Sequence, residues 1–354
     1  MSKKYYSDEL VLPGETILEM MEEYGLTQRE LAVRMDYTPK HINEVIKGKS
    51  QITVEFAMRL ESVFGLKSNF WVNLESNYRE QLVRINEYDQ LKIEEAIARE
   101  IPYAHMAKLS WVPTTKKINE KVINLRSFFR VSKLTQIKSV YDCAFREKGK
   151  DNSSSYAQAA WIARGEQIAT SVDVSSFNRK KLNDSIDDFR KMTLMSPDEF
   201  IPQMIELCSN IGIALAFVPT LPKTFAHGAT KWISKDKVLI QLSLRYKYAD
   251  IFWFSFFHEL SHLLLHGKKI PYIEKNSELE IEADELASEL LIPNGEYMSF
   301  VEEDNITYKS ISDFSSKIDI HTGILVGRLM HDKIIDFHDF HDLRVKYEWR
   351  KEGA

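Results

Sequence analysis

Cysteine is scarce in this sequence, which holds Cys143 and Cys208 in 354 residues. Two distant cysteines form neither a disulfide framework nor a CxxC metal clip, so both patterns are excluded. No run approaches the roughly 20 apolar residues that cross a bilayer, and the opening stretch MSKKYYSDELVLPG lacks the apolar core of a signal peptide. We therefore expect an intracellular, cytoplasmic protein in a reducing compartment.

An excess of positive charge is also absent, because the formal net charge is −5. This balance argues against a general nucleic-acid coat or a polybasic membrane binder, although it leaves room for a local basic surface. The composition, 44% hydrophobic and 28% charged, is typical of a globular protein, and the length suits two or three domains.

The periodicity along the chain predicts a mainly α protein in three parts: residues 1–80, a helical linker region at 81–155, and residues 156–354. Two short runs rich in Ile, Val and Leu, IGIALAFVP and KVLIQLSL, are the best strand predictions, and both lie in the third part. They indicate a small sheet within an otherwise helical domain.

Two short amphipathic helices are predicted between residues 26 and 48. Thr27 and Glu30 form a T-x-x-E capping box that starts the first, and Thr38 followed by Pro39 starts the second, which Gly48 is expected to end. The tight connection predicts a helix-turn-helix, whose second helix enters the major groove of DNA.

Several polar residues of this region are candidates for DNA contact: Gln28, Thr38, Lys40, His41, Asn43, Glu44, Lys47 and Lys49. Long side chains on the outer face of the second helix can reach base edges, and Lys47 and Lys49 are placed for phosphates. Residues 1–80 are acidic overall, however, and spacing alone also fits an ordinary amphipathic bundle with a solvated face.

The stretch from LPGETILEMMEEYG to FWVNLESNY resembles the HigA-type antitoxins of the XRE helix-turn-helix class over nearly all of residues 10–80, including TQRELA and the GK turn. The resemblance implies a dimer that binds operator DNA and represses its own promoter. It also implies a possible cognate toxin as partner, although minimal antitoxins lack the long extension that follows here.

The stretch IFWFSFFHELSHLLLHG, residues 251–267, is apolar enough to be buried, yet it carries His258, Glu259, His262 and His266. Burying such groups is costly unless they are paired or bind a metal. On a helix, His258 and His262 share a face and can hold one zinc ion, with Glu259 placed as general base. The alternative is core histidines capped by carbonyls. His266 does not fit the spacing of a third histidine ligand and is expected at the helix end.

A catalytic zinc needs a third protein ligand. The stretch NSELEIEADELASELLIP offers Glu280, with Asp284 one turn later, where it can accept the distal N–H of a ligating histidine. Spacing alone leaves alternatives open. Glu280 also fits a capping box begun by Ser277, and Glu282 is the next choice as ligand. Other acidic residues would share a solvated face with Glu280: Glu278, Glu282 and Glu285.

The blocks HGATKW, FFHELSHLLLHGKK, EIEADELASELLIP and IHTGILVGRL are similar to the ImmA/IrrE-type metallopeptidases, a zincin family, over about residues 155–335. The resemblance implies an α+β zincin-like domain with three zinc ligands: His258, His262 and Glu280. It further implies Glu259 as base and Asp284 at the family's Asn/Asp position. Ser261 stands where the family commonly has glycine; both are small. The family's role implies regulatory proteolysis of a DNA-bound repressor.

An oxyanion-stabilising group cannot be chosen by spacing. The candidates by residue type are His227, Tyr272, His321 and His331. We favour His227, because it lies before the predicted strand KVLIQLSL, and an edge strand beside the zinc helix is where an extended peptide would add. The tail with His338 and His341 is expected to be a surface helix or tail.

Together these features predict a DNA-binding transcriptional regulator with a zinc-dependent endopeptidase domain that cleaves a partner repressor. The rival hypothesis is a HigA-like antitoxin and autorepressor in which the zincin domain is a structural or sensing module without peptidase activity. The sequence also leaves open whether the N-terminal part holds the peptidase inactive until a ligand or partner relieves it.

Overall fold

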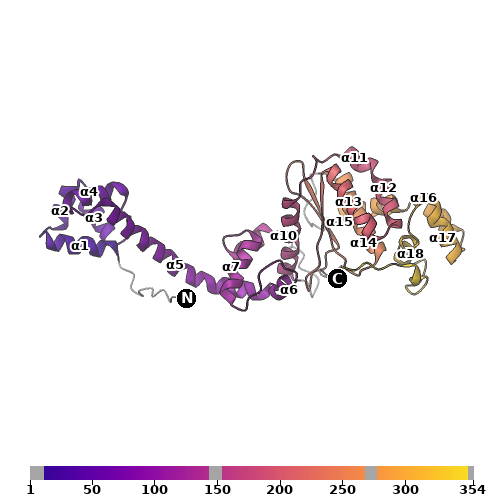
Figure 1. The fold of residues 1–354 in the computed structure, drawn as a ribbon, viewed down its shortest axis with the longest axis horizontal. Coiled ribbons are helices and arrows are strands. Elements are labelled where there is room, and N and C mark those ends of the chain that lie inside the picture. Colours follow the sequence, from indigo (N-terminus) through magenta and orange to yellow (C-terminus); the bar gives the residue numbers. More distant parts are fainter. Residues whose placement is uncertain (1–11, 143–153, 268–276, 350–354) are drawn as a thin grey trace. The chain divides into compact units, whose positions relative to one another are not determined.

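The computed structural model describes residues 12–142, 154–267 and 277–349, without the side chains at 84–90 and 277 (Figure 1). The chain divides into two compact units, residues 1–93 and 94–354. The predicted mainly α class is confirmed, since the described residues are mostly helical with one small sheet. Within these ranges no helix is both long and apolar enough to cross a membrane. The expected boundaries near residues 80 and 155 stay predictions.

The helices of the first unit are α1 (Pro13–Glu23), α2 (Gln28–Met35), α3 (Pro39–Ile46), α4 (Val54–Phe64) and the start of α5 (Ser68–Glu100). The two predicted helices are confirmed as α2 and α3. Thr27 and Glu30 form the capping box, and the Thr38 hydroxyl accepts a hydrogen bond from the backbone N–H of His41. Helix α3 ends at Ile46 with Lys47 as its C-cap, and Gly48 follows with a left-handed φ of 67°, as expected for a glycine that ends a helix.

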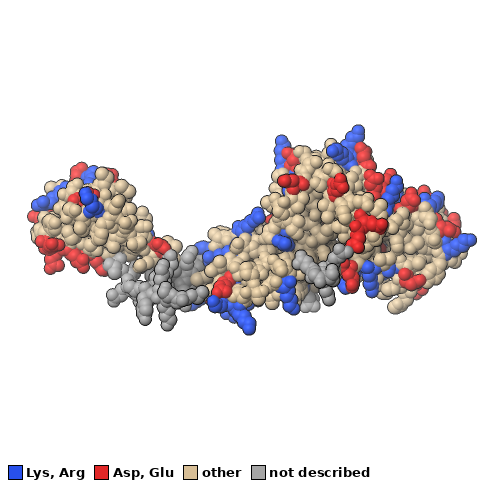
Figure 2. All heavy atoms as spheres, in the orientation of Figure 1, with Lys and Arg blue, Asp and Glu red and all other residues tan. Residues whose placement is uncertain are grey.

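The first unit has its own core, in which the apolar faces of α1 to α4 surround the fully buried Trp71 at the start of α5. Helix α1 approaches α3 closely at Gly14, where a Cβ atom would lie 1.9 Å from the carbonyl oxygen of Ile46. This close approach fixes α3 against the rest of the unit. On the face drawn in Figure 2, basic and acidic side chains are interspersed on both units.

The first half of the second unit contains the end of α5, α6 (Tyr103–Lys108), α7 (Ile118–Phe129), η1 (Leu134–Gln136), α8 (Ile137–Val140), α10 (Ser155–Ser171), α11 (Arg179–Asp184), α12 (Ile186–Lys191), η2 (Met192–Leu194) and α13 (Pro197–Ile211). The second half contains β1 (Ile213–Phe217), β2 (Gly228–Trp232), β3 (Val238–Leu242), α14 (Ala249–Leu265), α15 (Ser277–Leu291), α16 (Asn294–Glu302), α17 (Tyr308–Lys317), α18 (Thr322–His331) and η4 (His341–Leu343).

The sheet has the order β1-β3-β2, with β1 parallel and β2 antiparallel to β3. Both predicted strands are confirmed as β1 and β3, whereas β2 was missed. The expectation that KVLIQLSL forms an edge beside the zinc helix is wrong. All five residues of β3 are buried, as is usual for a central strand, and β1 and the half-buried β2 are the two edges.

Helices cover both faces of this sheet (Figure 1). Helix α10 packs on one face, and α13 and α14 pack on the other side. Helix α14 is buried along nearly its whole length, with Trp253, Phe256 and Phe257 in the core of the unit. Helix α15 packs along α14 through the fully buried Ala283 and Ala287, whose small side chains permit a close approach.

The C-terminal segment is partly buried, so the expectation of a surface helix or tail is wrong for Arg344 and Tyr347, whereas Val345 and Lys346 between them are exposed. The Arg344 guanidinium lies 2.7 Å from the Asp250 carboxylate, and the two side chains are only 5% and 9% exposed. The Tyr347 hydroxyl accepts a hydrogen bond from Trp253 Nε1. Ala249 N–H donates to the carbonyl of Val345. The segment therefore anchors the N-terminus of α14.

Replacing Arg344 with Met should lower the free energy of unfolding by about 3–5 kcal/mol, because the buried Asp250 carboxylate would lose its charged partner. Urea unfolding monitored by tryptophan fluorescence measures this. The double variant Asp250→Asn with Arg344→Met should recover much of the loss. Lys247→Met, which removes an exposed ion pair with Glu348, is the matched control and should cost less than about 1 kcal/mol. An equally small loss for Arg344→Met would contradict the assignment.

Candidate functional site

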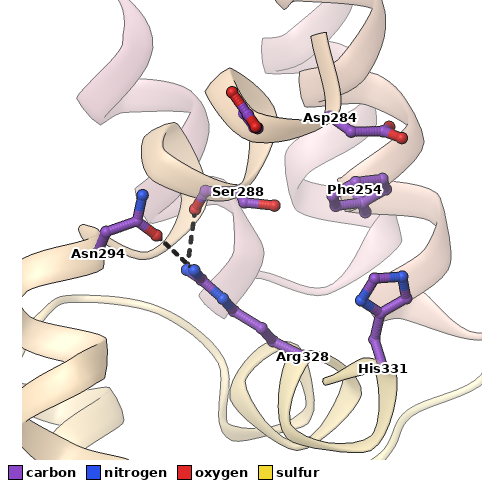
Figure 3. Close-up of a pocket in the computed structure, with 7 residues that line it drawn as sticks. Phe254, Asp284, Ser288, Asn294, Arg328 and His331 are labelled. Atoms are coloured by element: carbon purple, nitrogen blue, oxygen red, sulfur yellow. Dashed lines mark hydrogen bonds between the residues drawn. The ribbon is translucent and has the colours of Figure 1, made fainter. Parts of the chain in front are cut away.

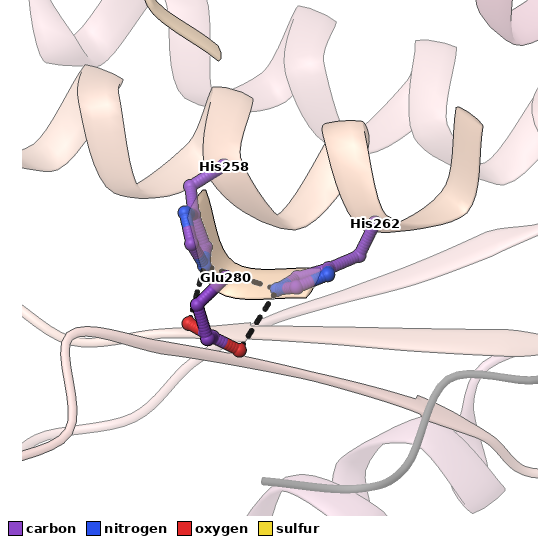
Figure 4. A group of neighbouring side chains, drawn as sticks. All are labelled: His258, His262 and Glu280. Carbon is purple, nitrogen blue, oxygen red and sulfur yellow. Dashed lines mark hydrogen bonds and ion pairs between the residues drawn. The ribbon is translucent and has the colours of Figure 1, made fainter. Parts of the chain in front are cut away.

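Helices α14 and α15 bring together two histidines and a carboxylate (Figure 4). His258 Nε2 and His262 Nε2 lie 3.0 Å apart, and the Glu280 carboxylate oxygens lie 3.3 Å and 3.4 Å from them. Ligand atoms at the usual zinc distances, about 2.0–2.2 Å in tetrahedral geometry, are separated by about 3.3 Å. The two histidine nitrogens and one Glu280 oxygen can therefore occupy three corners of a zinc coordination shell. Within the described residues, this is the group of His, Cys, Asp and Glu side chains close enough to hold a metal ion.

The side chains of His258 and His262 are 15% and 9% exposed, so both are largely buried on the mostly apolar helix α14. Asp284 Oδ1 lies 2.8 Å from Nδ1 of His258, on the ring edge away from Glu280. A carboxylate in that place fixes the tautomer that leaves Nε2 free for a metal. Nδ1 of His262 is buried and has no hydrogen-bond partner in the described part of the chain.

The cluster holds positive charge when no ion is bound. Burial lowers the pKa of His258, but hydrogen bonds with Asp284 and Glu280 outweigh it and raise the pKa to about 10. Burial raises the pKa of Glu280, but its hydrogen bonds with both histidines outweigh it and lower the pKa to about 2. The site is therefore arranged to hold a cation, and a metal ion can take the place of the proton.

Glu259 points from α14 toward the edge strand β2. Its side chain is buried, and the hydroxyl of Thr230 donates a 2.6 Å hydrogen bond to its Oε2. A Cβ atom at Gly228 would lie 2.5 Å from the other carboxylate oxygen, so only glycine leaves room for it. Burial raises the pKa of Glu259, and the attraction of the positive charge on His258 lowers it, with burial dominant. A buried carboxylate held in one orientation suits a general base.

The structure distinguishes the alternatives that spacing left open. Glu282 lies 3.9 Å from Nδ1 of His266 and not at the His258–His262 pair. His266 is the C-cap of α14, as expected, and its Nε2 lies 3.4 Å from the carbonyl of Leu279. Carbonyl capping is wrong for His258 and His262, whose Nε2 atoms face each other and Glu280. The proposed capping role of Ser277 lies outside the described side chains.

The oxyanion candidates have different environments. His227 directly precedes Gly228, beside Glu259, and its ring centroid lies 5.5 Å from that of Tyr246. His321 is the N-cap of α18 and accepts a hydrogen bond from Gly323 N–H. His331 ends α18 and lines a pocket with Asp284. Tyr272 lies outside the described residues. His338 is exposed, and His341 lies 2.9 Å from the Tyr248 hydroxyl.

Sequence reasoning missed Thr230 and Gly228, although both belong to the block HGATKW. Each acts on Glu259 from about 30 positions away in the chain, and no spacing rule links a strand residue to a helix residue at that separation. It also missed Asp250, which is held by a residue near the end of the chain. A buried acid on an apolar helix was the available signal, because such a group requires a partner.

The residues predicted to contact DNA lie on or beside α2 and α3. Lys40 is 84% exposed and forms a 3.9 Å ion pair with Glu44. Asn43 is half-buried at the surface of α3. Lys47 is the exposed C-cap of α3, and Lys49 is exposed in the following turn.

The remaining DNA candidates include residues with structural roles. Thr38 caps α3, and the ring of His41 stacks on Tyr37 with centroids 4.9 Å apart. Gln28 is half-buried at the first position of α2. Long exposed side chains are therefore concentrated at Lys40, Lys47 and Lys49.

Comparison with known proteins matches each of the two regions separately. The helix-turn-helix family matches residues 17–71, and a metallopeptidase family described as IrrE N-terminal-like domain matches residues 247–314. The chain is 33% identical over 64 residues to an uncharacterized HTH-type transcriptional regulator, YddM, of Escherichia coli, covering 18% of this chain and 68% of the relative. It is 33% identical over 67 residues to virulence-associated protein I of Dichelobacter nodosus, covering 19% of this chain and 62% of that protein.

Purified wild-type protein should contain about one zinc ion per chain by elemental analysis, and Glu280→Ala should lose most of it, because one of three protein ligands is removed. Glu282→Ala removes a neighbouring acid of α15 that lies beside His266, and it should keep the wild-type zinc content. Equal zinc in the Glu280→Ala and wild-type proteins would exclude Glu280 as a ligand.

Proposed function

We propose that this chain joins a DNA-binding regulator to a zinc-dependent endopeptidase. It belongs to the helix-turn-helix family through residues 17–71 and to the IrrE N-terminal-like family through residues 247–314. The single observation that supports the peptidase is the convergence of the nitrogens of His258 and His262 with the Glu280 carboxylate, next to the buried carboxylate of Glu259. The substrate we propose is a partner repressor protein.

The residues of this site support hydrolysis of a peptide bond. His258, His262 and Glu280 would hold a zinc ion, which would supply Lewis-acid activation of water and of the peptide carbonyl. Glu259 takes a proton from the attacking water and passes it to the leaving amine, while the water oxygen bonds to the carbonyl carbon and the C–N bond breaks. Thr230 holds one oxygen of Glu259, which leaves the oxygen beside Gly228 for the proton.

The substrate would bind as an extended strand along β2. This strand is one of the two edges of the sheet, and its residue Thr230 already contacts Glu259, so a peptide added there would run past the base. His227 begins this segment and is our choice for stabilising the oxyanion, since it directly precedes Gly228. Asp284 fixes the ring of His258 from behind.

The first unit would bring this activity to operator DNA. We assign base contacts to Lys40 and Asn43 of α3, and phosphate contacts to Lys47 and Lys49. As in the HigA-type antitoxins that the region resembles, we expect a dimer that represses its own promoter. The acidic balance of the chain makes the few exposed lysines near α3 decisive for binding.

A second candidate function is repression without proteolysis, with or without neutralisation of a cognate toxin. The observation that favours it is that one named relative is described as an HTH-type transcriptional regulator and matches only 64 residues, 18% of this chain. In that case the bound metal would stabilise the second unit, or sense a signal, and repression would not depend on Glu259.

Glu259→Gln should keep the zinc and lower cleavage of the co-expressed repressor by at least about 100-fold, because general-base catalysis contributes about 10²–10⁴. Electrophoresis of the repressor with time, alongside zinc content, measures this. Glu278→Gln, an exposed acid of α15, is the control and should cleave normally. Cleavage unchanged in Glu259→Gln would refute the mechanism, and none in any form would favour the second candidate.

Asn43→Ala should weaken binding to DNA from the chain's own promoter by about 1–3 kcal/mol and leave binding to unrelated DNA unchanged. Lys47→Ala should weaken both and reduce the slope of log affinity against log salt by about 1. Gel shifts over a range of salt concentrations measure these effects. Lys67→Ala, which removes an exposed lysine paired with Glu61, serves as control. Affinity independent of salt and of both substitutions would refute the DNA-binding assignment.

A further inference from the structure

A pocket of about 450 Å³ lies between α14, α15 and α18 (Figure 3). Phe254 of α14, Asp284 and Glu285 of α15, and His331 of α18 contribute side chains to its wall. Asp284 belongs to both places, because its Oδ1 lies 2.8 Å from Nδ1 of His258. Phe254 is one helical turn before His258 on α14, and the two ring centroids are 6.4 Å apart. The pocket therefore adjoins the reacting site and shares residues with it.

Arg328, the strongest cation in the pocket wall, is already occupied. Its guanidinium donates hydrogen bonds to the carbonyls of Ser288 and Ile292 and to the side chain of Asn294. It also lies 3.9 Å from the ring centroid of Tyr297. These contacts join α18 to the end of α15, and Arg328 Nε lies 3.6 Å from the Asp332 carboxylate, so Arg328 has a structural role and its charge is compensated there. An anionic ligand would gain little from it.

The two carboxylates in the pocket wall, by contrast, are accessible to a ligand. Glu285 is exposed, and the Asp284 side chain is 56% exposed although one oxygen contacts His258. The ring of Phe254 is partly buried and offers an apolar and π-rich surface beside them. In Figure 3, Asp284, Phe254 and His331 follow one another along one side of the pocket. An apolar surface beside carboxylates suits a long aliphatic stem that ends in a cation.

We propose that this pocket binds the lysine or arginine side chain of a substrate residue next to the bond that is cut. The proposal rests on the peptidase function proposed above and names its substrate class. An extended peptide advances about 3.3 Å per residue, so a side chain entering beside His258 belongs to a residue within one or two positions of the scissile bond. An acidic side chain there would meet two carboxylates and be repelled.

Glu285 is the residue that tests this, because it lines the pocket without contacting a metal ligand, whereas changing Asp284 would also disturb His258.

Full-length zinc-loaded protein is assayed with fluorogenic peptides that carry the cleavage sequence of the repressor. The peptides differ only at the two residues flanking the cut, where they carry Lys, Arg, Leu or Glu. We expect kcat/KM for Lys and Arg peptides to exceed that for Leu and Glu peptides by about tenfold or more. Glu285→Lys should abolish this preference and leave the Leu peptide unchanged. Glu303→Gln, an exposed acid outside the pocket, should behave as wild type.

The outcomes separate this proposal from the one on which it rests. Cleavage with no basic preference, or with a preference that Glu285→Lys leaves intact, would overturn the subsite and keep the peptidase. If no peptide is cleaved, the peptidase proposal fails, and binding decides the subsite. N-acetyl-lysine methylamide should then shift amide resonances of α15 and α18 in wild type but not in Glu285→Lys, and N-acetyl-glutamate methylamide should shift neither. Equal shifts from both compounds would overturn the subsite.

Discussion

The cost of burying charged groups on α14 governs the arrangement of the second unit. The helix is apolar enough to lie in the core, yet it carries ionisable side chains, and each is matched by a partner from another element. Asp250 is paired with Arg344 of the C-terminal segment, Glu259 with Thr230 of β2, and His258 with Asp284 and Glu280 of α15. Removing Arg344 would leave the buried charge of Asp250 uncompensated, and removing Thr230 would deprive the buried Glu259 of its hydrogen bond. The strand, the tail and α15 are therefore positioned around the helix by the same requirement that creates the site.

Local patterns predicted much of this molecule, because the forces that they reflect act within a few residues. The Thr27–Glu30 capping box, the start of α3 and the two buried strands follow from spacing and side-chain type. The pairing of His258 with His262 follows from the helical repeat, and Glu280 was one of two alternatives. The rest depends on contacts distant in sequence. Nothing in the half-buried β2, or in an arginine near the end of the chain, indicates which acid on α14 it will face.

In the first unit, some of the side chains that are candidates for DNA contact also stabilise the turn between α2 and α3. Thr38 caps α3 and His41 packs on Tyr37, so both contribute to the shape of the connection between α2 and α3. The exposed positive charges lie near the two ends of α3, at Lys40, Lys47 and Lys49. A substitution at Thr38 or His41 would therefore combine a loss of local stability with any loss of DNA contact, whereas substitution of the exposed side chains of Lys47 and Lys49 should change local stability less.

The carboxylate of Asp284 contacts His258 and also lines the neighbouring pocket. Binding at the metal site and binding in the pocket are therefore thermodynamically linked. A cationic occupant that draws on the Asp284 carboxylate weakens its hold on the ring of His258, and a bound metal that draws on His258 changes what the carboxylate can offer the occupant. The two affinities must then alter each other by the same factor, whichever ligand arrives first. In the peptidase proposed above, selectivity for the peptide and affinity for the metal would thus be coupled through Asp284.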